Sequence, residues 1–559
     1  MFKQRNRFML SVEARRDVPV ATKFNVLRYN NATIALLFIL TLGLFGCGGG
    51  GGGGGGTPVG PDTSPPATMP ELAAPTNGYQ SAGIPVSGTA LTVKKFLSNQ
   101  SDELVFFNRT GARMTINVAA QLSGALAASR VVSGNTVAKP DSSVVIPPID
   151  ISHSTRLHQV LRDNEKLMPP FSPNASRRGS VIAARKADNV GDTVNFRVLM
   201  GTDLTQLGTV NATCRSVTSL SGSGDANLNI YLDTSLVYDT TAKNFISQLA
   251  QAWPTIYNKV RATFGEEPPA DFNSLGKDIS VVLSPALEIA GFFNSGDLFP
   301  PDQIEGGKSN QRKIFYMQYA PANSQIRLTV ADTESTMAHE FQHMINFYQR
   351  NSRGLKEDDW LNEAMSGYSE HICGFTMTTN NISKALQVQK FFNRTPDVDL
   401  TLSPWPGTLD HEHYGQVYLF GVWLGEKYGI DGSLRNLVSG NFVGKSGIAA
   451  ISNKLFDAVV AEWMIALVVN DQTKGAKYGY EDIDLYTTYT YDASVTGNGK
   501  SQQIQFSGPS RFTNNAVLPF SGAISIDSWS GAYLKIGGGN GSDLVLSLPS
   551  QVSVFEMHK

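Results

Sequence analysis

The sequence predicts a multidomain α+β protein, in which a central α+β unit is flanked by a β-sandwich-like N-terminal domain and a β-rich C-terminal region. From about residue 76 to about residue 233, short runs of alternating apolar and polar residues are separated by Gly, Ser, Asn and Pro, as in strands joined by turns. From Thr333 to Asn470 the apolar residues recur at helical spacing. From about residue 475 the alternating pattern returns with many glycines. The chain of 559 residues has room for roughly two to four domains.

Residues 1–47 are expected to form a signal peptide. Basic residues precede an apolar run from Ala32 to Gly46, which is short for a membrane span but suits the apolar core of a signal peptide. The segment Leu44-Phe45-Gly46-Cys47 resembles the lipobox of bacterial lipoproteins. We therefore expect Cys47 to be lipidated and to anchor the chain to a membrane of the bacterial cell envelope, at the outer membrane or the cell surface. The alternative to lipidation is a plain cleaved signal peptide or a short membrane anchor. Because the stretch before the apolar run is long, Met9 is a second candidate for the start of translation.

Residues 48–75 are expected to be a flexible tether. They begin with nine consecutive glycines and continue with a Pro-rich stretch. Such a composition cannot form a packed core, but it extends and bends freely. The tether would hold the folded domains clear of a membrane.

Residues 76–180 are expected to form the β-sandwich-like domain, because β-branched and aromatic residues alternate there with polar ones. The runs that carry this pattern are "LTVKKFL", "DELVFFN", "RMTINVAAQL" and "SSVVIPPIDI".

Residues 181–474 are expected to form the α+β unit, and residues 475–559 the C-terminal β-rich region. Strands continue to about Asp233, and a helical pattern with a break or kink at Pro254 follows. The runs "DISVVLSPAL" and "RKIFYMQYA" then predict two more strands, directly before the long helical stretch.

Charge and cysteine content narrow the class of protein. Lys and Arg total 46 against 48 Asp and Glu, a net charge of -2, so nothing favours nucleic acid as a partner. Charged residues make up only 17% and Gly is abundant, which suits an extracytoplasmic protein. After Cys47, only Cys214 and Cys373 remain. They form either one disulfide or two free thiols.

The segment "MAHEFQHMINFYQR", residues 337–350, predicts a zinc-binding helix. A helix that begins near Asp332 or Thr333 brings His339 and His343 onto one face, because residues four apart are neighbours on a helix. Both imidazoles can then reach one Zn²⁺, with Glu340 beside the metal as a general base.

A third ligand is predicted at Glu363. The metzincin pattern would need Gly and His where this chain has Asn346 and Gln349, so that class is excluded. Downstream, "EDDWLNEAMSGYSEHI" (residues 357–372) predicts a second helix with Glu363 among apolar and aromatic neighbours. This carboxylate would complete a His₂Glu site with one position open for water.

The motifs "MAHEFQHMINF" and "WLNEAMSGYSE" together resemble those of the gluzincin metallopeptidases, in particular the hyicolysin-type family. Further similarity lies in "GFFNSGDLF" (291–299), "SNQRKIFYM" (309–317) and "HYGQVYLFGVWLGEKYG" (413–429), and the resemblance covers roughly residues 185–475. It implies a thermolysin-like zinc endopeptidase acting on extracellular or periplasmic proteins. It also implies a small sheet over the zinc helix, whose edge strand binds extended substrate, and "RKIFYMQYA" is our candidate for that strand.

Two features of the predicted site stay open, namely the group that orients a zinc histidine and the group that stabilises the oxyanion. Thermolysin-like enzymes have an aspartate four residues after the ligand glutamate to orient a zinc histidine; this chain has Gly367, and Ser366 is our candidate for that task. The resemblance also implies a Tyr or His that stabilises the oxyanion, for which we expect Tyr414 first and His413 second.

The segment "GTLDHEHYG" makes Asp410 the alternative third ligand. A surface-anchored adhesin or binding lipoprotein with an inactive peptidase-like domain is the alternative function.

Overall fold

The computed structural model divides the chain into two compact units, residues 1–65 and 66–559, and only parts of the second unit are described. The described residues are 81–84, 91–93, 102–122, 152–171, 188–200, 206–220, 226–287, 289–320, 328–402, 410–496, 499–511, 516–517, 520–537, 544–547 and 552–558. The predicted signal peptide, the lipidation site Cys47 and the tether lie outside them. Within these ranges, no helix is long and apolar enough to cross a membrane.

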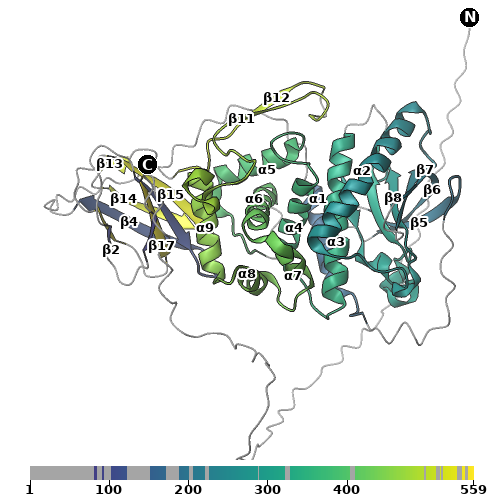
Figure 1. The fold of residues 1–559 in the computed structure, drawn as a ribbon, viewed down its shortest axis with the longest axis horizontal. Helices are drawn as coiled ribbons and strands as arrows, with labels where there is room; N and C mark the ends of the chain where they lie inside the picture. The colour runs from purple at the N-terminus through teal and green to yellow at the C-terminus, as the bar shows by residue number, and fades with distance from the viewer. Residues whose placement is uncertain are drawn as a thin grey trace, which may run out of the picture. The chain divides into compact units, whose positions relative to one another are not determined.

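A six-stranded mixed sheet forms the first layer of the central unit (Figure 1). Its strands, in spatial order, are β5 (Thr193–Met200), β6 (Gln206–Ser219), β7 (Asn227–Asp233), β8 (Ile279–Ser284), β10 (Lys313–Gln318) and β9 (Gly291–Phe293). The β7–β8 and β8–β10 pairs are parallel, whereas the other pairs are antiparallel. The inner strands β8 and β10 are buried along their whole length, as expected of strands covered on both faces.

The edge strand differs from our expectation. The segment "RKIFYMQYA" forms β10, an inner strand that pairs with both β8 and β9. The edge belongs to β9, which is only three residues long. The prediction was wrong because three residues are too few to show a strand pattern in a sequence.

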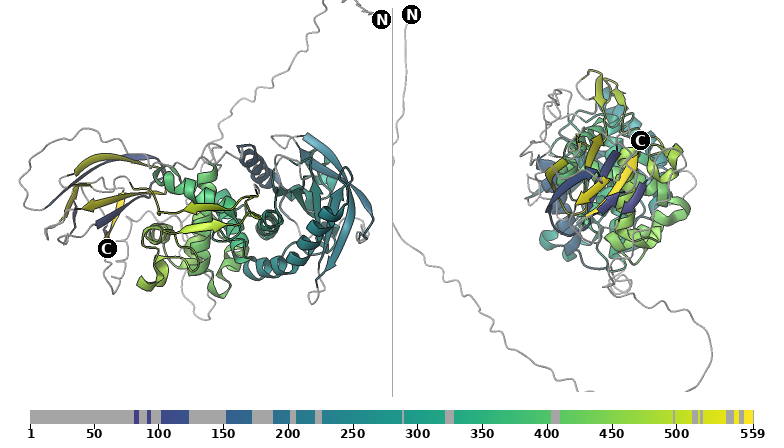
Figure 2. Two further views of the ribbon diagram at one scale, coloured as in Figure 1. Left: turned by 90° about the horizontal axis from the view of Figure 1, so that it is seen from above. Right: turned by 90° about the vertical axis from the view of Figure 1, so that its left-hand side faces the viewer.

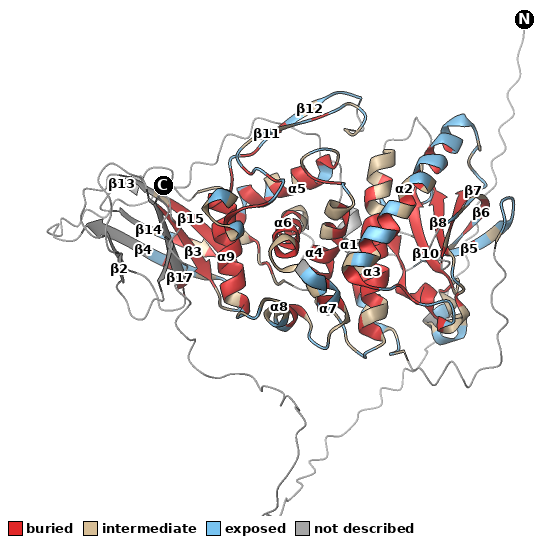
Figure 3. Cartoon of the chain, viewed as in Figure 1, coloured by how far each residue is buried: buried red, intermediate tan, exposed pale blue. Residues whose placement is uncertain are grey.

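Two long helices, α2 (Thr240–Phe264) and α3 (Val330–Asn351), pack on one face of this sheet. In α2, Asp239 is the N-cap and accepts a hydrogen bond from the amide of Ala242 at 2.9 Å. Pro254 lies inside the helix without ending it. The inward faces of both helices are buried and their outward faces are more exposed (Figure 3). This is how an amphipathic helix packs against a sheet.

A helical region follows, as the sequence predicts. Its helices are α4 (Asp359–Ile372), α5 (Ile382–Asn393), α6 (Asp410–Tyr428), α7 (Ser433–Ser439), α8 (Gly444–Ser452) and α9 (Phe456–Val469). The helix α4 packs against α3 on one side and α6 on the other. At Gly421 the backbones of α6 and α4 come so close that an added Cβ would lie 2.3 Å from the carbonyl oxygen of Ala364. The coarse α+β organisation, a mixed sheet followed by helices, is thus confirmed.

The flanking β-strands are arranged differently from the expected separate regions. Strands from both ends of the chain alternate within two shared sheets (Figure 2). One sheet has the order β1 (Ser81–Ile84), β17 (Val552–His558), β3 (Asp102–Asn108), β15 (Ser530–Gly537), β13 (Ala516–Val517). The other has the order β14 (Phe520–Ile526), β4 (Met114–Leu122), β16 (Leu544–Ser547), β2 (Leu91–Val93). The remaining strands, β11 (Thr488–Tyr491) and β12 (Gln502–Gln505), form a separate antiparallel pair.

Two further differences concern the predicted regions 76–180 and 475–559. Residues 152–167, expected within the β domain, form helix α1 (Ser152–Leu167). The strand β3 lies between β15 and β17, so the two regions complete each other's sheets. Alternation identifies the faces of a strand but not its partner, and the sequence therefore could not show this pairing. Cys214 and Cys373 are both free thiols.

We expect Gly421→Ala to destabilise the protein, because its methyl group would overlap the backbone of α4. The free energy of unfolding should fall by about 1–3 kcal/mol, measured by denaturant titration of the circular dichroism signal. Gly111→Ala is the matched control, since a Cβ there meets nothing within 4 Å. Equal stability of the two variants would contradict the close packing of α4 and α6.

Candidate metal centre

The centre is built on α3, whose first turn is fixed by a capping box. Thr329 is the N-cap and accepts a hydrogen bond from the amide of Asp332, while the Asp332 carboxylate accepts one from the amide of Thr329. The helix therefore begins three residues earlier than expected, with Asp332 inside its first turn. Such a reciprocal cap satisfies two backbone donors that a helix start otherwise leaves unpaired.

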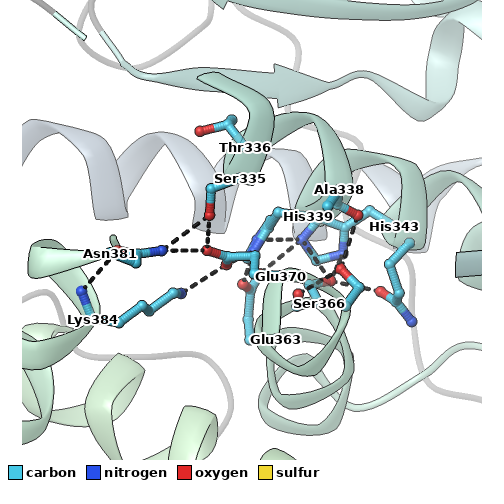
Figure 4. Close-up of polar contacts among 12 residues, drawn as sticks. Ser335, Thr336, Ala338, His339, His343, Glu363, Ser366, Glu370, Asn381 and Lys384 are labelled. Carbon is cyan, nitrogen blue, oxygen red and sulfur yellow. Dashed lines mark hydrogen bonds and ion pairs between the residues drawn. The ribbon is translucent and has the colours of Figure 1, made fainter. Parts of the chain in front are cut away.

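Three side chains converge on one point between α3 and α4 (Figure 4). The Nε2 atoms of His339 and His343 are 3.0 Å apart. The carboxylate of Glu363 lies 3.3 Å from Nε2 of His339 and 3.5 Å from Nε2 of His343. Ligands at the usual zinc distances of about 2.0–2.2 Å would be about 3.3 Å apart around a tetrahedral ion. The three groups are thus spaced as the ligands of one metal ion.

The electrostatics of this point favour a cation. Both carboxylate oxygens of Glu363 are buried and have no hydrogen-bond partner. Burial acts to raise the pKa of Glu363, but the two histidines hold it well below its ordinary value. Burial acts to lower the pKa of His339, but the neighbouring carboxylates of Glu363 and Glu370 raise it to about 9. A positive charge between these groups, as a proton or a metal ion, is what the surrounding carboxylates stabilise.

Glu340 faces the edge of the sheet. The backbone amide of Phe293, the last residue of β9, donates a hydrogen bond of 2.9 Å to its carboxylate. Burial raises the pKa of Glu340 to about 7. A carboxylate whose pKa lies near neutrality can take up and release a proton under ordinary conditions.

The loop after β9 is held to the strand β10 by a buried carboxylate. Asp297 accepts hydrogen bonds from the hydroxyl of Tyr316 at 2.7 Å and from the amide of Asn310 at 2.6 Å. Burial raises the pKa of Asp297 to about 7. The two segments that we matched to one family, 291–299 and 309–317, are therefore joined at this residue.

Glu370 orients His339, and the sequence analysis missed it. Its Oε1 lies 2.8 Å from Nδ1 of His339 and 2.9 Å from Nζ of Lys384. Ser335 and Asn381 donate hydrogen bonds of 2.6 and 3.0 Å to its other oxygen (Figure 4). With Nδ1–H donating to this carboxylate, the lone pair of His339 lies on Nε2, where a metal would bind.

The position of Glu370 has a simple reason. The expected aspartate position is Gly367, where an added Cβ would already touch the ring of Tyr418 on α6 at 3.4 Å, so little room remains for a longer side chain. Glu370 lies seven residues after Glu363, two turns further along the same face of α4. That spacing was the signal available in the sequence.

The Nδ1 atom of His343 is crowded. Asn362 Oδ1, Ser366 Oγ and a guanidinium nitrogen of Arg162 each lie 3.0 Å from it. The predicted neighbour Ser366 is thus in place, but beside His343, whereas Glu370 serves His339. Neither Asn362 nor Arg162 was anticipated from the sequence.

The predicted oxyanion groups lie on α6. His413 is buried, and burial lowers its pKa to about 4 against the opposing effect of a hydrogen bond to the backbone of Asp399. The ring of Tyr414 lies 5.7 Å from Nζ of Lys384, which binds Glu370. These contacts place Tyr414 on the His339 side of the centre and do not test either role. Asp410 begins α6, and its side chain is outside the described part of the chain.

One comparison with known proteins agrees with a metal centre at this place. The chain is 29% identical over 212 residues to neutral metalloprotease ShpI of Staphylococcus hyicus, an alignment that covers 36% of this chain and 44% of that protein. It also aligns with a solved aminopeptidase N family protein of Idiomarina loihiensis at 13% identity, over 50% of each chain. The TM-score of that alignment, 0.27, is too low to define the fold. No protein-family model matches. This chain, which spans less than half the length of its curated relative, is therefore a metalloprotease homologue that carries a buried His-Glu-x-x-His group.

Proposed function

We propose that this protein is a zinc-dependent endopeptidase of the gluzincin type. The single observation that carries the proposal is the convergence of His339, His343 and Glu363 within 3.0–3.5 Å of one another. A degenerate peptidase used only for adhesion would have no reason to bury a carboxylate whose oxygens lack hydrogen-bond donors. Similarity to a metalloprotease over 212 residues supports the same reaction.

His339, His343 and Glu363 would hold the zinc, and the chain's other residues orient these ligands. Glu370 fixes the ring of His339, while Asn362 and Ser366 contact the ring of His343. When bound, zinc supplies a Lewis acid for the scissile carbonyl and a water of lowered pKa.

Glu340 would accept a proton from the attacking water and later deliver it to the leaving amine. The amide of Phe293 holds its carboxylate in position. Since β9 is the edge strand, an extended peptide can pair with its free side through backbone hydrogen bonds. Such pairing accepts varied sequences. Tyr414, or His413 in its place, is proposed to stabilise the oxyanion.

The proposed setting follows from the first residues of the sequence. Lipidation at Cys47, with the Gly- and Pro-rich segment as tether, would anchor the enzyme at the bacterial cell envelope. Its substrates would then be extracellular or periplasmic proteins. Globomycin-sensitive processing and radiolabelled palmitate incorporation at Cys47 would test this anchor.

Replacing Glu340 with Gln should remove proteolysis while zinc stays bound, because the amide keeps the shape of the side chain but cannot accept a proton. Casein hydrolysis should fall by about 10²–10⁴-fold, with zinc content measured on the same sample. Glu334→Gln, elsewhere on α3, is the matched control. A Glu340→Gln variant with full activity would sink the assignment.

Removal of metal should abolish activity reversibly. Dialysis against a chelator should leave an inactive protein, and one equivalent of zinc should restore hydrolysis of casein, because the three ligands are already placed on packed helices. Magnesium is the control ion, since it prefers oxygen ligands in octahedral geometry. Activity that survives complete metal removal, checked by elemental analysis, would rule out the mechanism.

Glu370→Gln should weaken zinc binding by about 10- to 100-fold, because the neutral amide no longer holds Nδ1–H of His339 as firmly. The measurement is competition with a fluorescent chelator. The same substitution at Glu334, which lies elsewhere on α3, controls for the loss of a carboxylate from this helix. Unchanged zinc affinity would show that Glu370 serves only the packing of α3, α4 and α5.

A further inference from the structure

We propose that helix α1 is an autoinhibitory element, docked across the candidate active site and released before a peptide can bind. This inference rests on the proposed function and concerns how the same site is regulated. The helix lies N-terminal to the central sheet in sequence, yet it contacts the zinc helix, the helix of the third ligand and the loop after the edge strand.

The first contact is made by Arg162. Its guanidinium is 2% exposed and lies 3.0 Å from Nδ1 of His343. It forms an ion pair of 3.0 Å with Glu165, one turn further along α1, and burial raises the pKa of that glutamate to about 7. The Nε and Nη2 atoms of Arg162 are buried without a hydrogen-bond partner. Two of its three nitrogens therefore lack hydrogen bonds, and the guanidinium is held there mainly by the charges of nearby carboxylates, Glu165 and Glu363 among them.

The second contact lies beside the edge of the sheet. Leu161 belongs to the apolar cluster that includes Phe292 of β9 and Tyr316 of β10. The helix also contacts the 3₁₀ turn at Ser295–Leu298, directly after β9. The free side of β9 is where an extended peptide would add to the sheet. The docked helix and a bound substrate therefore compete for this edge.

The third contact holds the C-terminal end of α1 on the helical side. Lys166 forms an ion pair of 2.9 Å with Asp359 at the start of α4. Lys356 donates hydrogen bonds to the carbonyl oxygens of Glu165 and Met168 at 3.0 and 3.1 Å. The helix thus spans from the sheet to the helical region, which are the two walls of the proposed cleft.

With α1 docked, the centre is closed. His343 is 0%, Glu340 1%, Glu363 3% and His339 7% exposed. A peptide bond cannot reach a general base buried to this degree, so an element must move for hydrolysis to occur. Among the described elements outside α3, α1 contacts both the turn after β9 and α4, and it places a buried cation beside a zinc ligand.

The tautomer of His343 couples docking to the metal. A guanidinium only donates hydrogen bonds, so contact with Arg162 requires Nδ1 of His343 to accept and places the ring proton on Nε2. Zinc at Nε2 requires the opposite tautomer, with Nδ1–H donating to Asn362. Metal binding therefore removes the acceptor of Arg162 and weakens the docking of α1.

Release of α1 is tested with two substitutions in the full-length protein. Arg162→Met removes the charge at similar length, and Lys166→Glu places like charges opposite Asp359. Both should raise kcat/KM for an internally quenched peptide by about tenfold or more and speed hydrogen exchange in α1. Leu167→Ala, at a side chain of α1 that is exposed, is the matched control and should behave as the parent protein.

Each result decides the proposal. If both variants are folded and zinc-loaded but no faster than the parent, α1 is not inhibitory. A slower Arg162→Met variant would instead make Arg162 part of the working site. If no form hydrolyses any peptide, the proposed function fails by itself. The inference is then decided by hydrogen exchange: α1 amides that exchange faster after zinc addition uphold it, and unchanged exchange overturns it.

Discussion

The structure of the central unit depends on burying two imidazoles and a carboxylate at one point between α3 and α4. Ionisable groups are stable in an interior only when each polar atom has a partner or when opposite charges compensate one another. Glu363 has no hydrogen-bond donor for its oxygens, whereas the far nitrogens of both histidines are contacted by other side chains. The side that lacks partners faces a single point, and a divalent cation there completes the arrangement.

Most of the surrounding architecture serves this requirement. Glu370 joins α3 to α4 and, through Lys384, to α5. It lies two helical turns after Glu363, whereas Gly367, between them, packs against Tyr418 of α6. On the opposite side, Phe293 joins the edge strand to Glu340. One buried hydrogen bond therefore connects the sheet that would bind a peptide to the helix that would cleave it.

The two ends of the chain are less separate than a linear description suggests. Strands before and after the central unit share two sheets, and the segment between the first strands and the central sheet supplies α1. The described N-terminal part of the chain thus contributes both to the flanking sheets and to the surface of the proposed cleft. Helix α1 belongs to the same chain as the site and contacts it through few hydrogen bonds. Such an element is suited to reversible closure.

Local sequence patterns were sufficient to predict the helices and the central residues of the site. Two histidines four residues apart lie on one face of any helix, so His339, Glu340 and His343 could be placed without a structure, and Glu363 followed from a second amphipathic segment. The longer strands were likewise visible as alternation. Four features could not be predicted from the sequence: the edge strand, the orienting Glu370, the contact of Arg162 and the interleaving of the terminal strands. Each of these depends on which elements meet, and a sequence pattern fixes the faces of an element while packing between distant segments selects its neighbours.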